Sequence, residues 1–264
     1  MQKEIIDIIP SEVSKTLSIR GMIAKPLEKI KLQHRAEKYE YKEDPGGIAY
    51  IRKTVHPGSI VFDIGAHKAG YLHFFLEQLG ATGKIVAFEP QTILYKYLLQ
   101  LKQLFSWENV RIESLAVSDS TGKAMLCIPY NSGKPSSPCA TIIESRMDFQ
   151  YQSKEEVPTS SLDDYCREHN IYPDFLKVDV EGNELSVFKG AKELLQTHKP
   201  KILFECEARF VGKEKVLETI QFLQDMGYIG YFIDGVSVYP IALFDISLHQ
   251  DENSGHYCNN FIFE

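Results

Sequence analysis

The chain has 264 residues, of which 44% are hydrophobic and 25% are charged, the composition of an ordinary globular protein that needs no more than one large domain. Its formal net charge of −7 argues against a general nucleic-acid binder, which needs a basic face. No run approaches the roughly 20 apolar residues of a membrane helix, and MQKEIIDIIPSEV lacks the basic and apolar regions of a signal peptide.

Residues 1–47 are predicted to form an N-terminal helical extension. The segment KPLEKIKLQHRAEKYEYKE is rich in helix formers and alternates in charge, and Pro45, Gly46 and Gly47 are expected to end the helix. The remainder, residues 48–264, is expected to be one domain, with IAYIRKTVHPGS leading into its first strand.

From residue 60 the pattern alternates between strands and helices. The predicted strands are IVFDIG, KIVAFEP, NVRIESLAV, FLKVDV, PKILFECE, GYFID and NNFIFE, and most are separated by helical segments such as GYLHFFLEQLG, TILYKYLLQLKQLF, NELSVFKGAKELLQTH and VLETIQFLQDMGY. Strands alternating with helices of this length predict an α/β fold with a doubly wound, mostly parallel, Rossmann-like sheet.

Residues 120–158 depart from this alternation. TGKAMLCIPY is predicted to be a short strand or hairpin, whereas residues 129–158 are rich in Ser and Pro and have no long periodicity. A loop of this length in a compact domain is functional or disordered. An acceptor-binding loop and a mobile connector both fit it. An acceptor pocket is expected to be built by residues 129–158, the N-terminal helices and the C-terminal stretch YPIALFDISLHQDENSGHY.

The turn in IVFDIGAHKAGYLHFF connects the first strand to a helix, so it is expected to present backbone N–H groups to a nucleotide-like ligand. Tyr71 and Leu72 stand where a phosphate-binding P-loop has Lys and Ser or Thr. His67 stands where the second glycine of GxGxxG would allow close approach of a dinucleotide pyrophosphate. S-adenosylmethionine has no phosphate, and this turn suits it better.

S-adenosylmethionine also needs an acid for its ribose. Glu89 ends the second strand, 26 residues after Asp63, beside the first turn in a doubly wound sheet. A carboxylate there can accept hydrogen bonds from both ribose hydroxyls; the alternative is a solvated Glu before Pro90. Asp63 is expected to reach the amino-acid end of the cofactor, directly or through water.

Six segments, in order, resemble the FkbM family of S-adenosylmethionine-dependent methyltransferases from about residue 48 to the end of the chain. They are VFDIGAHKAGY, AFEP, LAVSD, TSSLDDY, FLKVDVEGNELSVFKGA and ILFECE. The resemblance implies a seven-stranded class I methyltransferase sheet and methyl transfer mostly onto hydroxyl oxygens of sugars, polyketides or other secondary metabolites. One departure is the order of Ala69 and Gly70, where glycine is expected first.

The resemblance also implies roles for individual residues. Glu89 would bind the ribose, and Asp179 and Glu181 would face the methyl group and the acceptor. The methionine part would be bound by Asp63, Gly65, Ala66, His67 and Gly70. The adenine would be lined by Ala116, Val117 and Ser118.

Methyl transfer to an alcohol requires alignment of the acceptor oxygen with the C–S bond and removal of its proton. In FLKVDVEGNE, Lys177, Asp179 and Glu181 are predicted to alternate onto one face of a strand, with Glu205 across from them on the next strand. One of these carboxylates is expected to be the base or to orient the acceptor. A purely structural pair of Lys177 with Asp179 is the alternative.

Other assignments for these groups stay open. Oxygen ligands from Asp179, Glu181 and Glu205 suit a divalent cation such as Mg²⁺, but no spacing rule supports a metal. His256, just before the last strand, is a second candidate base.

Five widely spaced cysteines with no CxxC pair favour reduced thiols, and hence a cytoplasmic protein, over a disulfide framework or a zinc site. The expected partner is a small-molecule or glycan acceptor, with no nucleic acid or membrane, and the N-terminal helical arm is compatible with a homodimer. Two other functions compete: a catalytically degenerate methyltransferase fold kept as a binding protein, and a nicotinamide-dependent oxidoreductase.

Overall fold

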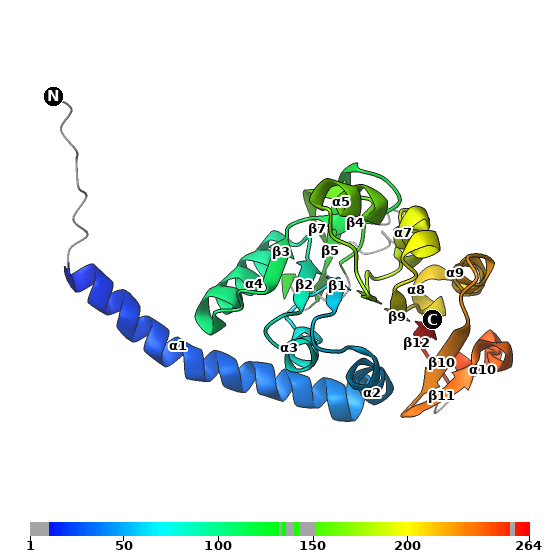
Figure 1. Ribbon diagram of the computed structural model, residues 1–264, viewed down its shortest axis with the longest axis horizontal. Helices are drawn as coiled ribbons and strands as arrows, with labels where there is room; N and C mark the ends of the chain where they lie inside the picture. Colours follow the sequence, from blue (N-terminus) through cyan, green and yellow to red (C-terminus); the bar gives the residue numbers. More distant parts are fainter. Residues whose placement is uncertain (1–10, 132–133, 136–139, 143–151, 254–256) are drawn as a thin grey trace.

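The apolar runs of the sequence pair into one large sheet in the structure, a computed structural model that describes residues 11–131, 134–135, 140–142, 152–253 and 257–264. Within these residues the sheet has eight strands in the order β11-β10-β12-β9-β8-β1-β2-β3 (Figure 1). Its strands are β1 (Ile60–Ile64), β2 (Lys84–Phe88), β3 (Val110–Glu113), β8 (Phe175–Val178), β9 (Lys201–Glu205), β10 (Gly230–Asp234), β11 (Ser237–Pro240) and β12 (Asn260–Phe263).

The pairing confirms the predicted mostly parallel sheet. Strands β3, β2, β1, β8 and β9 are parallel, whereas β12 runs antiparallel to both of its neighbours, β9 and β10. Strand β11 pairs antiparallel with β10 and extends the edge beyond the seven expected strands. It follows Asp234 in a tight hairpin and was not predicted; all four of its residues are exposed.

Alternating side chains bury both faces of this sheet. Val61 and Ile85 pack into one apolar cluster with side chains of the N-terminal helices, whereas Phe62 and Val86 pack into a second cluster on the opposite face. Helices α2 (Pro45–Thr54), α3 (Leu72–Leu79) and α4 (Thr92–Phe105) contribute to the first cluster. Helices α5 (Leu162–His169), α6 (Glu184–Lys189), α7 (Lys192–Thr197) and α9 (Lys213–Asp225) contribute to the second.

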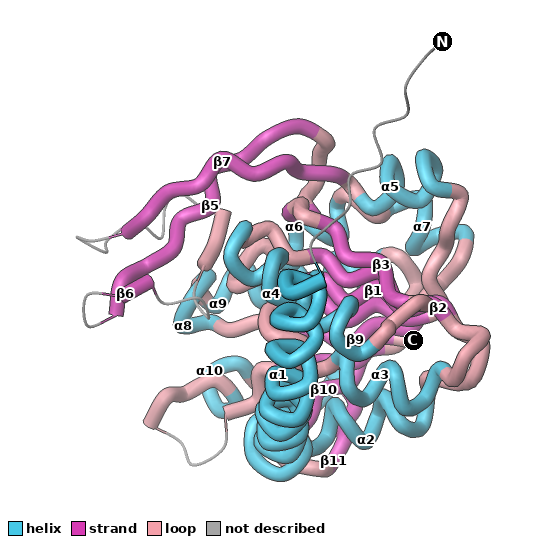
Figure 2. Tube along the Cα trace, turned by 90° about the vertical axis from the view of Figure 1, so that its left-hand side faces the viewer, coloured by secondary structure: helices cyan, strands magenta, loops and turns pink. Residues whose placement is uncertain are grey.

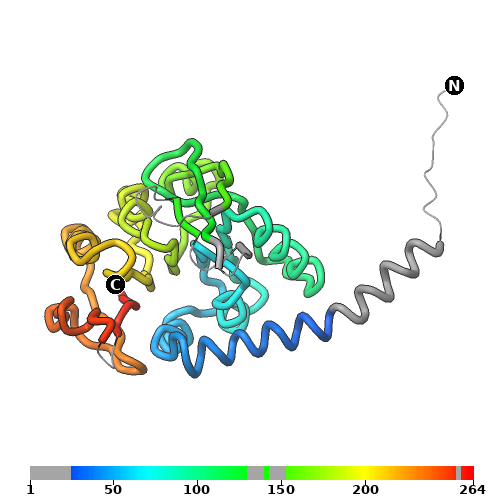
Figure 3. The backbone as a smooth tube through the Cα atoms, turned by 180° about the vertical axis from the view of Figure 1, so that it is seen from behind, coloured from blue at the N-terminus to red at the C-terminus, as the bar shows by residue number. Residues whose placement is uncertain are grey.

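The N-terminal segment is a long helix that runs into the domain. Helix α1 (Ser11–Lys38) passes α3 and α4 (Figures 1 and 3) and continues into a π-helical turn, η1 (Tyr39–Glu43). Pro45 was expected to end this helix before the domain begins, but it is instead the first residue of α2. A residue without an N–H fits the first position of a helix. The expected boundary between residues 47 and 48 therefore falls inside α2.

A second, smaller sheet replaces much of the expected loop. Strand β5 (Gly122–Asn131) pairs antiparallel with β7 (Gln152–Ser160), and β4 (Ala116–Val117) and β6 (Lys134–Pro135) complete the sheet (Figure 2). Leu126 and Val157 help to bury its small apolar core. The remaining parts of the predicted acceptor loop, residues 132–133, 136–139 and 143–151, lie outside the described residues.

Two predicted elements are divided in the structure. The expected strand NVRIESLAV contributes β3 to the main sheet and β4 to the small one. The expected helix NELSVFKGAKELLQTH breaks into α6 and α7, because Asp163 of α5 accepts hydrogen bonds from the backbone N–H groups of Glu193 (3.0 Å) and Leu194 (2.9 Å) and so caps a new helix.

Three short elements lie in the C-terminal part of the chain, before or between β10 and β12. They are α8 (Ala208–Val211), the 3₁₀ turn η4 (Ile241–Leu243) and α10 (Ile246–His249). Among the helices of the described residues, none combines the length and the apolar character needed to cross a membrane.

Candidate functional site

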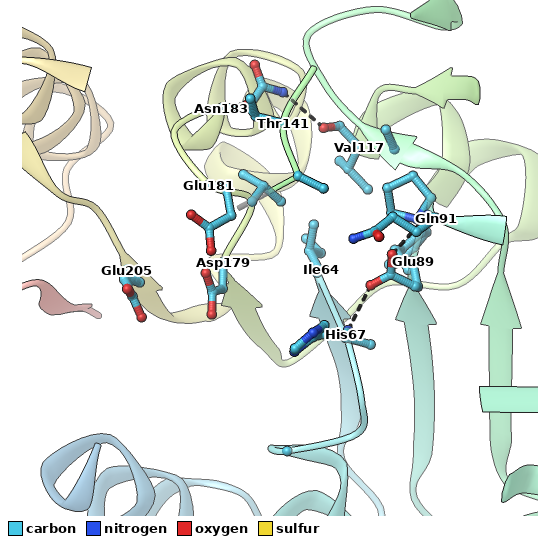
Figure 4. A pocket seen from close by; sticks show the side chains of 18 of the residues that line it. Ile64, His67, Glu89, Gln91, Val117, Thr141, Asp179, Glu181, Asn183 and Glu205 are labelled. Atoms are coloured by element: carbon cyan, nitrogen blue, oxygen red, sulfur yellow. Dashed lines mark hydrogen bonds between the residues drawn. The ribbon is translucent and has the colours of Figure 1, made fainter. Parts of the chain in front are cut away.

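A cavity of about 350 Å³ opens at the carboxyl ends of β1, β2, β8 and β9. Ile64 lies at its centre, with Glu89 and Gln91 on one side and Asp179, Glu181 and Glu205 on the other (Figure 4). Open α/β sheets bind ligands at this edge. Most of the residues predicted from sequence to form the site are brought together here: Gly65, Ala66, His67, Gly70, Glu89, Ala116, Val117, Asp179, Glu181 and Glu205.

The turn after β1 is held against β2 by its own backbone. The N–H groups of Gly65 and Ala66 both donate to the carbonyl oxygen of Phe88 at 3.0 Å, and the N–H of His67 donates to Glu89 Oε2 at 2.8 Å. For these three N–H groups the expectation that the turn presents them to a ligand is therefore wrong, because they bind the end of β2 and the adjoining Glu89. Burial, with Lys68 and Arg35 nearby, lowers the pKa of His67 to about 4, so its imidazole is neutral at physiological pH.

Glu89 is placed as predicted, directly after β2, and only 3% of it is exposed. Its Oε1 accepts from the Gln91 N–H at 2.9 Å, and Oε2 accepts from His67. Burial raises its pKa to about 7, and the two backbone hydrogen bonds oppose that rise. Each carboxylate oxygen keeps a second lone pair for a ligand hydroxyl.

An apolar wall continues from Glu89 toward the small sheet. Ala116, Val117 and Leu126 line the cavity with Thr141 and Ile142, and Figure 4 shows Thr141 beside Val117. Residues 140–142 of the predicted acceptor loop therefore adjoin the predicted adenine residues.

Ser118 lies behind this wall, outside the lining residues. Its hydroxyl accepts from the Asn183 side-chain amide at 3.3 Å, and the same amide donates to the Val117 carbonyl oxygen at 3.3 Å. Asn183 thus fixes the wall from the far side of the cavity.

The acids of DVEGNE line the opposite side, by a geometry that differs from the prediction. Strand β8 ends at Val178, so Asp179 and Glu181 do not share a strand face with Lys177. Glu181 has φ 54° and lies in a turn that brings its carboxylate toward that of Asp179 (Figure 4). Glu184, which was not predicted to have a role, is buried, and its Oε1 accepts from the Gly182 N–H at 2.8 Å, which holds this turn.

Glu205, the last residue of β9, lies beside these acids. Asn259 donates to Glu205 Oε1 at 3.0 Å and to Glu207 Oε1 at 3.1 Å. Burial, reinforced by the nearby Asp179 carboxylate, holds the pKa of Glu205 well above its usual value. Glu205 therefore binds a proton more readily than an ordinary glutamate.

Beneath the cavity floor lies a buried lysine surrounded by acids. Lys177 is 0% exposed, and its Nζ is 3.6 Å from Asp179 Oδ2 and 4.5 Å from the centre of the Tyr71 ring. Burial lowers the pKa of Lys177, but the carboxylates of Asp179, Glu205, Asp44 and Asp63 outweigh burial and raise it. Lys177 is thus the cation that balances this acidic cluster.

Asp63 belongs to this buried layer and does not line the cavity. It is 1% exposed, and within the described residues neither its Oδ2 nor Lys177 Nζ has a hydrogen-bond partner. Burial raises the pKa of Asp63 to about 7, against the opposing effect of Lys177. Asp63 is therefore placed below the turn, without a direct path to a ligand.

The N-terminal segment, which was expected to help build the acceptor pocket, supplies a wall of the cavity, but no residue of it was singled out from the sequence. Tyr39 and Glu43 of η1 and the following Asp44 line it, as do Glu207 and Asn259 near the carboxyl terminus. No local pattern marks Tyr39, Glu43 or Asp44, because their role depends on how the N-terminal helix packs. His256, the second candidate base, lies outside the described residues.

The acidic side of the cavity does not assemble a metal centre in the described part of the chain. There, no group of three or more His, Cys, Asp or Glu side chains is arranged to hold a metal ion.

The fold is that of known methyltransferases. The FkbM methyltransferase from Methylobacillus flagellatus KT aligns over 96% of this chain and 60% of its own, with a TM-score of 0.50 and 13% identity. This chain thus spans less than two thirds of that protein, and at such identity the likeness concerns the fold alone.

Two further structures align less well. A methyltransferase from Aquifex aeolicus has a TM-score of 0.45 and 15% identity over 86% of this chain and 91% of its own. An O-methyltransferase from Thermotoga maritima has a TM-score of 0.45 and 15% identity over 84% of this chain and 64% of its own.

No curated protein sequence matches the chain significantly. The sequence model of the methyltransferase FkbM domain, however, matches residues 63–229, which is more than half of the chain. This match spans the turn after β1, Glu89 and the acids of DVEGNE, and it confirms the resemblance seen in the sequence motifs. The chain belongs to the FkbM methyltransferase domain family.

Proposed function

We propose that this protein binds S-adenosylmethionine and transfers its methyl group to a hydroxyl oxygen of a small-molecule or glycan acceptor. One observation carries the proposal: a single cavity has the buried acid Glu89 and an apolar wall on one side of Ile64 and a cluster of carboxylates on the other. The first side suits a nucleoside, and the second suits removal of a proton.

The backbone of the turn favours S-adenosylmethionine over a dinucleotide. A pyrophosphate needs free N–H groups at the turn, whereas those of Gly65, Ala66 and His67 are bound to the end of β2. A ribose needs only the carboxylate of Glu89, and an adenine needs the apolar surface of Val117 and Leu126.

The acidic side supplies the base for an alcohol. When bound, S-adenosylmethionine supplies a methyl group on a positively charged sulfur. Asp179, balanced by Lys177, accepts the proton of the acceptor hydroxyl as the new C–O bond forms and the C–S bond breaks, its electron pair staying on sulfur. Glu205, whose raised pKa favours a proton on its carboxyl group, orients the acceptor by hydrogen bonding.

Calorimetric titration with S-adenosylmethionine, S-adenosylhomocysteine and NAD tests the cofactor. We expect micromolar binding of the first two and none of NAD. Glu89→Ala should weaken binding at least about tenfold, since hydrogen bonds to a charged group contribute roughly 1.5–3 kcal/mol each. Glu113→Ala is the matched control, because Glu113 ends the neighbouring strand β3 outside the cavity lining. Binding of NAD alone would refute the proposal in favour of an oxidoreductase.

Transfer of a labelled methyl group to a panel of methyl glycosides tests the reaction. Asp179→Asn should abolish transfer while S-adenosylhomocysteine still binds, which separates chemistry from cofactor affinity. A wild-type protein that binds the cofactor but methylates no glycoside would contradict hydroxyl methylation and favour a binding protein on the same fold.

A further inference from the structure

The π-helical turn η1 places an aromatic side chain at the acidic side of the cavity. The N–H of Asp44 donates to the carbonyl oxygen of Tyr39, five residues earlier, at 2.9 Å, and this wide turn directs Tyr39, Glu43 and Asp44 to the cavity. Single π turns are rare and frequently occur at functional sites. Tyr41, in the same turn, points away and is 76% exposed.

Tyr39 is held in place from two sides. Its ring packs edge-on against Tyr71, with the ring centres 4.9 Å apart. The ring also lies so close to Gly70 that a Cβ there would come within 2.7 Å of it. The position of the phenol is therefore set by the turn that the family motif encodes.

The rest of the segment is anchored to the same turn and to the buried acids. Tyr71 donates to Asp44 Oδ2 at 2.7 Å, and Asp44 Oδ1 accepts from the Gly47 N–H at 2.9 Å. Arg35, one helical turn before Tyr39, donates to the carbonyl oxygen of Lys68. A wall fixed by three such contacts keeps its shape when a ligand enters, so it is able to select one.

The surroundings of Tyr39 suit contact with an acceptor better than contact with the nucleoside. The carboxylates that act on its phenol are led by Asp179 and Glu205, on the far side of Ile64 from Glu89. Burial and these carboxylates raise the pKa of Tyr39, so the phenol is neutral and both donates and accepts a hydrogen bond.

We propose that Tyr39 binds the acceptor through a second hydroxyl next to the one that is methylated, so that the enzyme selects vicinal diols such as those of a sugar ring. This inference rests on the proposed function. The reacting hydroxyl faces Asp179 and its neighbour faces the phenol of Tyr39. On the same wall Glu43 is ion-paired with Lys38 and Glu207 with Arg209, and both cations also line the cavity, so this wall selects by hydrogen bonding rather than by net charge.

The test compares Tyr39→Phe with wild type on whichever methyl glycoside of the panel is methylated and on its deoxy analogue lacking the neighbouring hydroxyl. Wild type should lose roughly three- to tenfold in kcat/KM on the deoxy analogue, the range for one neutral hydrogen bond. Tyr39→Phe should lose the same factor on the parent glycoside and nothing further on the deoxy analogue. Tyr41→Phe is the matched control and should behave as wild type.

Two controls separate the outcomes. Tyr39→Phe should bind S-adenosylhomocysteine within about twofold of wild type, which also shows that it folds. The role of Tyr39 would be overturned if Tyr39→Phe and wild type had equal kcat/KM on the parent glycoside. It would also be overturned if the loss in kcat/KM were matched by an equal loss in affinity for S-adenosylhomocysteine. Either result would leave the proposed function intact. A wild-type protein that methylates no member of the panel would instead overturn the proposed function and the role of Tyr39 with it.

Discussion

The backbone of Gly65 lies directly against the carbonyl oxygen of Asp179, so close that a Cβ at Gly65 would be 1.8 Å from that oxygen. The turn after β1 and the end of β8 therefore meet backbone to backbone at the centre of the site. Gly65 also has φ 88°, a conformation that side chains disfavour. The glycine is required here for two separable reasons.

Gly65→Ala is expected to abolish binding of S-adenosylhomocysteine and to destabilise the fold, because the new methyl group forces β1 and β8 apart. Gly58→Ala is the matched control: Gly58 has φ 89°, but the nearest atom to a Cβ there is 3.7 Å away. Gly58→Ala should therefore lower the free energy of unfolding only by the conformational strain, about 1–2 kcal/mol. Chemical denaturation and calorimetry measure both effects, and equal losses in the two variants would contradict the collision.

Ala69→Gly is expected to leave stability unchanged or to raise it by up to about 1 kcal/mol, because Ala69 has φ 65°, in the left-handed region that glycine prefers. This position is the one at which the sequence departs from the expected glycine-first order. Ala66→Gly, in the same turn but without positive φ, should lower stability by about 1 kcal/mol. A denaturation midpoint that falls as far for Ala69→Gly as for Ala66→Gly would refute this account.

Lys177→Met is expected to destabilise the protein by about 3–5 kcal/mol, since removing the buried cation leaves several carboxylates uncompensated. Lys201→Met is the control, because the Lys201 side chain is 48% exposed and its ion pair with Glu264 contributes little. Adding Asp63→Asn to Lys177→Met should recover part of the loss by removing one of the acids. If the double variant is no more stable than Lys177→Met, Asp63 is not coupled to this lysine.

Asp63→Asn is expected to change how stability depends on pH. The pKa of Asp63 is raised from 3.8 to about 7 in the folded protein, so between about pH 4 and pH 7 the folded state binds more protons than the unfolded state. The Asp63 carboxyl group therefore makes the free energy of unfolding fall as the pH rises through that interval. In Asp63→Asn, which cannot titrate, the dependence of stability on pH should lose this contribution.

Denaturant midpoints of wild type and Asp63→Asn across that interval isolate the effect of Asp63. The comparison is needed because His67 has the opposite effect on stability. Its pKa is lowered in the folded protein, so its contribution makes the protein less stable as the pH falls. A constant difference between the two proteins at every pH would show that Asp63 does not titrate in this way.

The sheet and the cofactor side of the site were predictable because their signals are local. Apolar runs that end in a polar residue placed Glu89 and Asp179 at strand ends, and the carboxyl ends of parallel strands share one edge. The ends of the strands were less predictable. The chain turns away after Val178, so Glu181 reaches the cavity from a turn. Strand β3 ends at Glu113, whereas the sequence pattern predicted one strand through to Val117.

The N-terminal helices were expected to contribute to the acceptor pocket, but no such signal marked which of their residues do so. Whether Tyr39 or Tyr41 faces the cavity depends on a π turn and on contacts with Tyr71 and Gly70, none of which leaves a periodic pattern. The binding of the turn's N–H groups to Phe88 and Glu89 was hidden for the same reason, since it is a contact between segments distant in sequence.

Tyr39, Glu43 and Asp44 stand before residue 63, where the match to the family begins. Under the proposed function, the residues that would hold the methyl donor lie within the matched region, whereas part of the wall that would face the acceptor lies before it. Changes in residues 38–44 are expected, under that function, to alter the choice of acceptor more than the binding of S-adenosylmethionine. A chimaera that exchanges residues 38–44 between relatives would therefore transfer selectivity without rebuilding the catalytic turn.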